Sequence, residues 1–236
     1  MNHNLRLFFW VGLFAAAMAF LESAIVVYLR ALYYPAGFVF PLKMMDPNLL
    51  VTEIFREAAT IVMLFTVGAI AVKGWLKRFA FFIYAFAVWD IFYYIYLYLL
   101  LGWPPSIFTW DLLFLIPVTW VGPVLAPVIN SLTMILLAAI IIKYKSEDET
   151  FRLTFYEWLL LITGSLIIIF AYTYPYSAYM LDRYTFSQWF NFSSSKEVFD
   201  YAAAFVPVTF SWVIYSLGQL LFFWMIFHMV RRRRRG

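Results

Sequence analysis

Six long, almost uninterrupted apolar stretches constrain this chain more than any other feature of its sequence. They cover residues 8–32, 51–72, 79–101, 121–142, 155–173 and 206–230. A helix needs about 20 apolar residues to cross the roughly 30 Å hydrocarbon core of a bilayer, and each stretch is close to or above that length. Hydrophobic residues make up 65% of the chain and charged residues only 13%, whereas soluble domains are about half apolar and a quarter charged. The sequence therefore predicts an all-α transmembrane bundle of six spans, which forms a single integral membrane domain over residues 1–236.

The apolar segment over residues 106–117 is expected to lie along the membrane surface. As a helix it would extend only about 18 Å, which is too short to cross the hydrocarbon core. Pro117 prevents the segment from continuing as one helix into the next stretch, and Trp103 and Trp110 are typical of interfacial anchors. We therefore predict a short interfacial helix here, with Asp111 complementing the positive end of its dipole.

The basic residues divide unevenly between the two sides that six spans create. Twelve of the seventeen lie on one side, namely Arg6, Lys73, Lys77, Arg78, Lys143, Lys145, Arg152 and the five arginines at 231–235. The other side has Arg30, Lys43, Arg56, Arg183 and Lys196. Because cytoplasmic loops of membrane proteins carry an excess of Lys and Arg, this division predicts a cell-membrane protein with both termini in the cytoplasm.

The two terminal regions each have a competing interpretation. Residues 17–19, Ala-Met-Ala, match a signal-peptide cleavage pattern, but the apolar run continues to Leu29 and favours a membrane span. The arginines at 231–235 could recognise nucleic acid or lipid, yet directly after a span they are typical of a topology anchor at anionic headgroups. We therefore expect the lipid bilayer, and no nucleic acid, as a partner. Residues 191–193, Asn-Phe-Ser, match a glycosylation pattern that matters only in a eukaryote.

The scarcity of certain residue types excludes several kinds of site. The chain has no cysteine and only two histidines, which excludes disulfides, thiolate zinc, iron–sulfur clusters and a bis-histidine haem inside the membrane. It also lacks a glycine-rich phosphate loop, a His-Glu-x-x-His zinc motif and a Gly-x-Ser-x-Gly nucleophile elbow. The sequence therefore predicts no metal site and no cofactor, and it leaves open whether the protein is an enzyme.

Polar side chains recur at one depth inside the predicted spans. Counting 1.5 Å per residue from the side rich in basic residues places Glu22 about 21 Å deep, and Asp90, Asn130 and Gln219 about 18–20 Å deep. A charge at the bilayer centre costs about 2.5–3.5 kcal/mol on insertion scales, so the two acids need an explanation. Asn130 and Gln219 are typical of side chains that hydrogen-bond a neighbouring helix. We expect all four to line a polar pocket in the bundle.

A second group of charges lies nearer the side with fewer basic residues. Glu53, Arg56 and Glu57 open the second span, and Arg30 closes the first. Glu53 and Arg56 are spaced to pair along one helix, whereas Glu53 and Glu57 would repel each other unless a cation lies between them. Arg30 is the expected external partner of these two acids. Alternatively, the helix dipole alone stabilises the acids and Arg30 snorkels to the membrane surface.

Glu22 and Asp90 are predicted to face one interhelical cavity. Their estimated depths agree within about 3 Å, and two carboxyl groups in contact there would share a single proton. Arg30 and Arg56 are estimated to lie several ångströms higher, although either could descend to pair with one acid. In the alternative interpretation, each acid is protonated and only hydrogen-bonds a neighbouring helix.

Three functions fit these predictions. The favoured one is a non-catalytic membrane protein that binds or transports a small or lipid-like ligand through a polar pocket open to the non-cytoplasmic side. The second is a lipid-modifying enzyme in which Glu22 and Asp90 act as acid and base while an arginine holds a headgroup. The third is an accessory subunit that packs against other membrane proteins. The predicted ligand-binding residues are Glu22, Arg30, Glu53, Arg56, Glu57, Asp90, Asn130 and Gln219.

Overall fold

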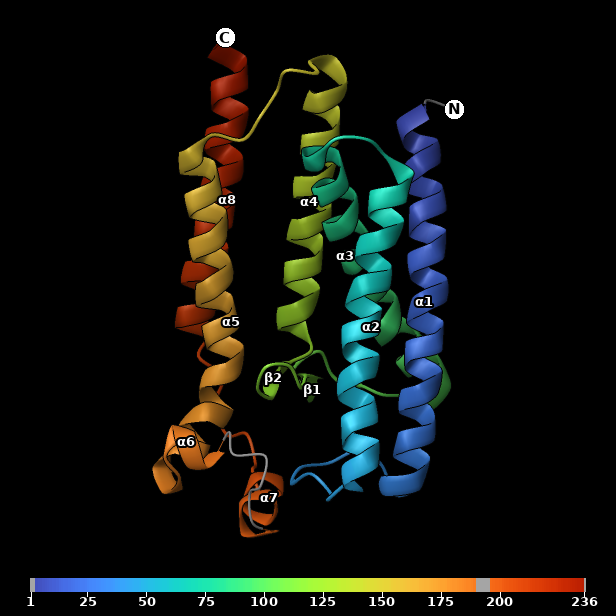
Figure 1. Cartoon of the computed structure of the whole chain (residues 1–236), viewed down its shortest axis with the longest axis vertical. Coiled ribbons are helices and arrows are strands. Elements are labelled where there is room, and N and C mark those ends of the chain that lie inside the picture. The colour runs from blue at the N-terminus through green and yellow to red at the C-terminus, as the bar shows by residue number, and fades with distance from the viewer. Residues whose placement is uncertain (1–2, 190–195, 236) are drawn as a thin grey trace.

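The protein is a mostly helical bundle in which six long helices run side by side (Figure 1). The structure, a computed structural model, describes residues 3–189 and 196–235. The long helices are α1 (His3–Tyr33), α2 (Pro47–Ala71), α3 (Trp75–Leu101), α4 (Leu125–Glu147), α5 (Phe155–Arg183) and α8 (Trp212–Arg235). All six are long and apolar enough to cross a membrane. By helix length and hydropathy, this is a multi-pass membrane protein, and the predicted number of spans is confirmed.

Local sequence signals explain where two of the long helices begin. The Asp46 side chain caps α2 by accepting hydrogen bonds from the backbone N–H groups of Asn48 at 2.9 Å and Leu49 at 3.4 Å. Thr154 and Glu157 cap α5 reciprocally, because each side chain accepts a hydrogen bond from the other residue's backbone N–H. These caps satisfy N–H groups that a helix start leaves unpaired.

The segment over residues 106–117 does not form the predicted interfacial helix, so the all-α prediction is wrong here. The chain instead forms an antiparallel β-hairpin of β1 (Trp110–Phe114) and β2 (Trp120–Pro123). Aromatic and β-branched residues, which are frequent in this stretch, favour strands over helices. Pro117 lies between the strands, where its missing N–H removes no ladder hydrogen bond.

The hairpin lies inside the bundle, between α2 and α5, and α1 and α2 continue past it (Figure 1). Asp111 of β1 is 2% exposed and Val121 of β2 is fully buried. The Trp120 ring stacks on the Tyr172 ring of α5, with centroids 6.0 Å apart. The strands of a segment predicted to lie on the membrane surface therefore pack against the helices, whereas residues 106–108 and Pro117 are exposed.

The long helices form two packed groups. In the first group α1, α2 and α4 pack against α3, and in the second α5 packs along α8. Gly164 and Gly218 allow α5 and α8 to approach closely, because a Cβ on Gly218 would lie 2.9 Å from the Gly164 carbonyl oxygen. Small residues at helix crossings are typical of membrane bundles. The two groups meet through α4 and α8 and through β2, which packs on both α4 and α5.

Two short helices, α6 (Phe186–Trp189) and α7 (Lys196–Ala203), follow α5. The rings of Tyr179 on α5 and Tyr201 on α7 stack 4.3 Å apart and hold α7 against the end of α5. The last long helix begins at residue 212 rather than at the predicted residue 206. The glycosylation pattern at 191–193 lies outside the described residues.

Both chain termini lie at one end of the bundle (Figure 1). We name this the arginine end, because residues 231–234 of α8 lie there, and we name the opposite end the hairpin end. An even number of crossings brings the two termini together in this way. Which end faces the cytoplasm stays a prediction from the distribution of basic residues.

Single cysteines introduced into this cysteine-free chain test the topology. Glu147 at the arginine end and Ser106 at the hairpin end are both exposed. We expect an impermeant thiol reagent outside intact cells to label the Ser106→Cys variant at once and the Glu147→Cys variant only after the membrane is opened. Labelling of both variants from one side would contradict the six crossings, and the reverse pattern would contradict the orientation.

Candidate functional site

A cluster of charged side chains, which we name the acidic site, joins α1 to α2. It consists of Glu22 from α1 and Glu53, Arg56, Glu57 and Thr60 from α2. The Arg56 guanidinium pairs with the carboxylate of Glu22 and, through Nε at 2.8 Å, with that of Glu53. Thr60 Oγ1 donates a hydrogen bond to Glu22 at 3.2 Å. The three carboxylate side chains belong to residues that are only 6–8% exposed, so the cluster is buried.

The spacing along α2 explains why its polar residues meet. Positions 53, 56, 57 and 60 recur at i, i+3, i+4 and i+7, which places all four on one face of a helix. Other faces of α2 expose large apolar side chains, among them Ile54 and Phe55. The predicted pairing of Glu53 with Arg56 is confirmed.

Glu57 connects the acidic site to the hairpin. Its Oε2 accepts a hydrogen bond of 2.9 Å from the backbone N–H of Leu115. Leu115 directly follows β1 and lies outside the strand, so the helix supplies the acceptor for its amide. Breaking this contact would remove a hydrogen-bond donor from the buried Glu57 carboxylate and leave the part-buried Leu115 amide without its acceptor, which is costly. The contact therefore ties the hairpin to α2.

A second ion pair anchors β1 to α1. Arg30 Nη2 lies 3.6 Å from Asp111 Oδ1, and the Tyr94 hydroxyl of α3 donates to Asp111 Oδ2 at 3.2 Å. The Arg30 guanidinium also lies over two aromatic rings, 3.8 Å from the Trp103 centroid and 4.6 Å from that of Phe38. These cation–π contacts keep the arginine in a buried position.

Asp111 lies in the hairpin, between the membrane spans, and is the most deeply buried acid of this region. Burial raises its pKa from the ordinary 3.8 to about 6, while Arg30 and the hydrogen bond from Tyr94 oppose the rise. The carboxyl group therefore titrates close to neutral pH.

Asp90 lies on α3 and bonds a different helix from Glu22. The Ser131 hydroxyl of α4 donates to Asp90 Oδ2 at 2.8 Å, whereas Glu22 bonds Arg56 and Thr60 on α2. Within the described residues, no hydrogen bond joins the two acids. The structure gives them separate partners, as in the interpretation that each bonds a neighbouring helix.

The two arginines have partners that the favoured interpretation did not give them. Arg56, although estimated to lie several ångströms higher than the acids, pairs with Glu22, which was the alternative left open. Counting along a helix locates the backbone, but the long arginine side chain moves its charge by several ångströms. Arg30, expected to pair with Glu53 or Glu57 or to snorkel, is 8% exposed and pairs with Asp111. Asp111 itself, expected to complement an interfacial helix, lies in a buried strand.

Asn130 and Gln219 belong to a network that joins α4, α5 and α8. Asn130 Nδ2 donates to the Tyr172 hydroxyl at 2.8 Å, and its Oδ1 accepts from the Tyr215 hydroxyl at 3.0 Å and from Gln219. Thr133 donates to Gln219 Oε1 at 3.2 Å. This pattern confirms that both residues link neighbouring helices.

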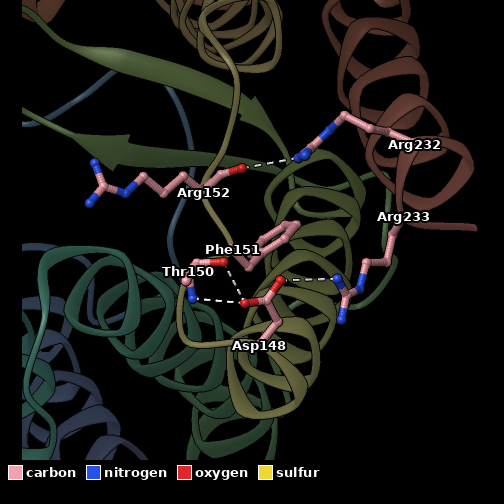
Figure 2. Close-up of a pocket in the computed structure, with 6 residues that line it drawn as sticks. All are labelled: Asp148, Thr150, Phe151, Arg152, Arg232 and Arg233. Carbon is pink, nitrogen blue, oxygen red and sulfur yellow. Dashed lines mark hydrogen bonds and ion pairs between the residues drawn. The ribbon is translucent and has the colours of Figure 1, made fainter. Parts of the chain in front are cut away.

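The arginine end contains ion pairs that the sequence interpretation missed (Figure 2). Arg232 binds the fully buried Glu157 through Nε and Nη2, each at 3.0 Å, and donates to the Arg152 carbonyl oxygen at 3.0 Å. Arg233 Nη1 lies 3.1 Å from Asp148 Oδ2. Asp148, Arg152, Arg232 and Arg233 line part of a shallow depression. Two arginines of the run thus hold the protein's own helices together.

Sequence reasoning also missed Asp111, Tyr94 and Ser131 as partners of the predicted residues. Asp111 and Tyr94 act through the hairpin, whose buried position no local pattern indicated. Ser131 directly follows Asn130, so the depth count that selected Asn130 could have found it.

Comparison with known proteins leaves the function to be argued from this geometry. No family model, no curated protein and no solved structure matches the chain.

The Asp111→Asn variant should change how stability depends on pH. Because the pKa of Asp111 is raised to about 6 in the fold, the fold favours the protonated acid. This contribution to the free energy of unfolding is full below about pH 4 and is lost as pH rises through about 6, by about 3 kcal/mol in total. Thermal unfolding of the wild type between about pH 4 and 8 should show the loss, and the variant should lack that step.

Asp182→Asn is the matched control, because Asp182 is an exposed acid. Its profile should follow that of the wild type. Identical profiles for wild type and Asp111→Asn would contradict the raised pKa.

Proposed function

We propose that this multi-pass membrane protein binds a small cationic solute at the acidic site, and that the hairpin closes the site. An excess of buried acids supports the proposal. Among the described residues around the hairpin, five acids accompany two arginines; the acids are Glu22, Glu53, Glu57, Asp90 and Asp111, and the arginines are Arg30 and Arg56. Buried carboxylates without a positive partner are strongly unfavourable. Protons or a cationic group must therefore complete the charge.

An ammonium group fits this site better than a metal ion. Within residues 3–189 and 196–235, no three Asp, Glu or His side chains are arranged to hold a metal. An ammonium group donates up to three hydrogen bonds and accepts none. The carboxylates of Glu22, Glu53 and Glu57 provide only acceptor oxygens when ionised, so the two sets of groups are complementary.

Two buried indole N–H groups beside the hairpin indicate that the solute also carries a hydrogen-bond acceptor. The Nε1 atoms of Trp89 and Trp120 are buried and have no partner in the described structure. The Phe114 ring lies between the two indoles, 6.3 Å from Trp89 and 5.8 Å from Trp120. A buried donor without an acceptor costs about 1–3 kcal/mol, which a bound hydroxyl or carbonyl group would recover.

The hairpin is held at its position by one contact with the acidic site and one contact with α1. Glu57 holds it through the Leu115 amide, and Arg30 holds it through Asp111. A cationic solute would compete with these contacts, because it offers the Glu57 carboxylate a stronger, charged donor than a backbone amide. Binding would therefore loosen the hairpin on the α2 side.

The geometry favours binding over lipid chemistry. A lipid-modifying enzyme would need Arg30 or Arg56 to hold a headgroup, but both guanidinium groups already pair with carboxylates. Its acid and base, Glu22 and Asp90, bond different helices. A role as a subunit of a membrane complex predicts proteins that co-purify in mild detergent, and that observation would favour it.

Thermal unfolding of the purified protein in chloride salts of four cations, at constant ionic strength, tests the proposal. The probes are sodium, tetramethylammonium, ethanolamine and choline. We expect ethanolamine, which combines an ammonium group that donates hydrogen bonds with a hydroxyl group, to raise Tm more than choline or tetramethylammonium, whose quaternary nitrogen has no N–H. A ligand at about 100 times its Kd stabilises a fold by about 2.7 kcal/mol. The shift should shrink in acid, because protons compete for the same carboxylates.

Glu22→Gln should remove most of this shift, since it keeps the side-chain shape but deletes a carboxylate. Asp182→Asn removes an exposed acid and should keep the shift. Equal shifts in the wild type and Glu22→Gln, or no shift with any of the four cations, would contradict the proposal.

A further inference from the structure

The last three turns of α8 have two opposite faces. At about 100° per residue, positions 225, 229, 232 and 233 share one face, and positions 224, 227, 230, 231 and 234 share the other. Met225 and Met229 are fully buried, whereas Trp224 and Phe227 are each 51% exposed. The first group therefore forms the inner face of the helix end, and the second group forms its outer face.

The inner face uses its arginines within the protein. Arg232 holds the buried Glu157. Arg233 pairs with Asp148 at the end of α4 (Figure 2). Neither guanidinium group is free to act as the main contact of an external anion.

The two arginines of the outer face do not bind acidic side chains within the described part of the protein. Arg231 and Arg234 are exposed, and no acidic side chain among the described residues pairs with either. Together with Phe227 and Val230 they line a shallow groove along the helix. At i and i+3 the two guanidinium groups are neighbours whose positive charges repel each other. An anion placed between them would remove that repulsion.

We propose that this groove binds the phosphate of an anionic phospholipid, with Arg231 and Arg234 contacting the phosphate oxygens and Phe227 contacting the first part of an acyl chain. The order of residues along α8 supports a lipid. Toward the arginine end, apolar Phe227 and Val230 are followed by the two arginines, which matches an acyl chain followed by its charged headgroup. Arginine binds phosphate oxygens through paired N–H donors. The groove lies at the opposite end of the bundle from the acidic site, so this inference does not depend on the proposed function.

Native mass spectrometry of the full chain in detergent, titrated with phosphatidylglycerol or phosphatidylcholine, tests the assignment. The wild type should bind phosphatidylglycerol more tightly than phosphatidylcholine. The Arg231→Gln/Arg234→Gln variant should bind phosphatidylglycerol at least about tenfold more weakly, because each basic residue near an anionic lipid contributes strongly to binding. Its unfolding temperature without lipid should match that of the wild type, since neither arginine holds another element.

Arg232→Gln/Arg233→Gln is the matched control, because it removes the same charge from the same helical turn. It should keep the affinity for phosphatidylglycerol and should unfold at a lower temperature, since Glu157 loses its partner. If this variant does not fold, Arg6→Gln/Lys143→Gln removes two exposed charges from the same end and replaces it.

Three results would overturn the assignment. An equal loss of phosphatidylglycerol binding in the outer-face variant and in the control would show that net charge alone attracts the lipid. Equal affinity for the two lipids would show that the groove does not select an anion. Displacement of phosphatidylglycerol by an equal concentration of inorganic phosphate would show that the site holds a free anion and not a lipid.

Discussion

A β-hairpin enclosed by apolar helices requires partners for every polar group that the helices cover. Hydrocarbon offers no hydrogen bonds, so backbone outside a helix persists at membrane depth only where protein or water surrounds it. Here the neighbouring helices supply partners to several groups of the hairpin, although the Trp120 indole N–H has none in the described structure. Glu57 accepts from the Leu115 amide, Arg30 pairs with Asp111, and Tyr172 covers Trp120. The hairpin also joins the two groups of helices, together with the network of Asn130 and Gln219 between α4 and α8.

The charged side chains around the acidic site are also arranged so that buried groups have partners. The buried acid of the hairpin, Asp111, has Arg30 and the Tyr94 hydroxyl as its partners. Arg56 is shared between Glu22 and Glu53, which leaves Glu57 to the hairpin. Removing one partner from a buried ion pair costs about 3–5 kcal/mol. The carboxylates therefore hold the closed arrangement together, and their excess over arginines makes the same region receptive to a positive ligand.

The long helices could be predicted because length and hydropathy are local properties of the chain. The pairing of Glu53 with Arg56 could also be predicted, since both lie one turn apart on one helix. The hairpin could not, because a short apolar segment has no periodicity that separates a strand from a buried helix. The pairing of Arg30 with Asp111 was missed for this reason, since it depends on where the hairpin lies.

The arginine end shows a different limit of sequence reasoning. The five consecutive arginines have the same side chain, so residue type does not distinguish them. Only the rotation of α8 relative to α5 makes Arg232 bind Glu157 while Arg231 is exposed. That rotation is set by packing at positions such as Gly164 and Gly218, which bring the two helices together. The sequence shows which residues share a face of the helix. It does not show which face packs against the protein, because that depends on the neighbouring helix.

Hydrogen–deuterium exchange over residues 110–123 in a lipid bilayer tests most directly whether the hairpin is a covered and tethered part of the bundle. The account predicts that the hairpin amides exchange nearly as slowly as those in the middle of α3, and that Glu57→Ala selectively accelerates exchange at Leu115. Exchange of residues 110–123 as fast as that of the exposed loop between α1 and α2, with no effect of Glu57→Ala, would contradict it.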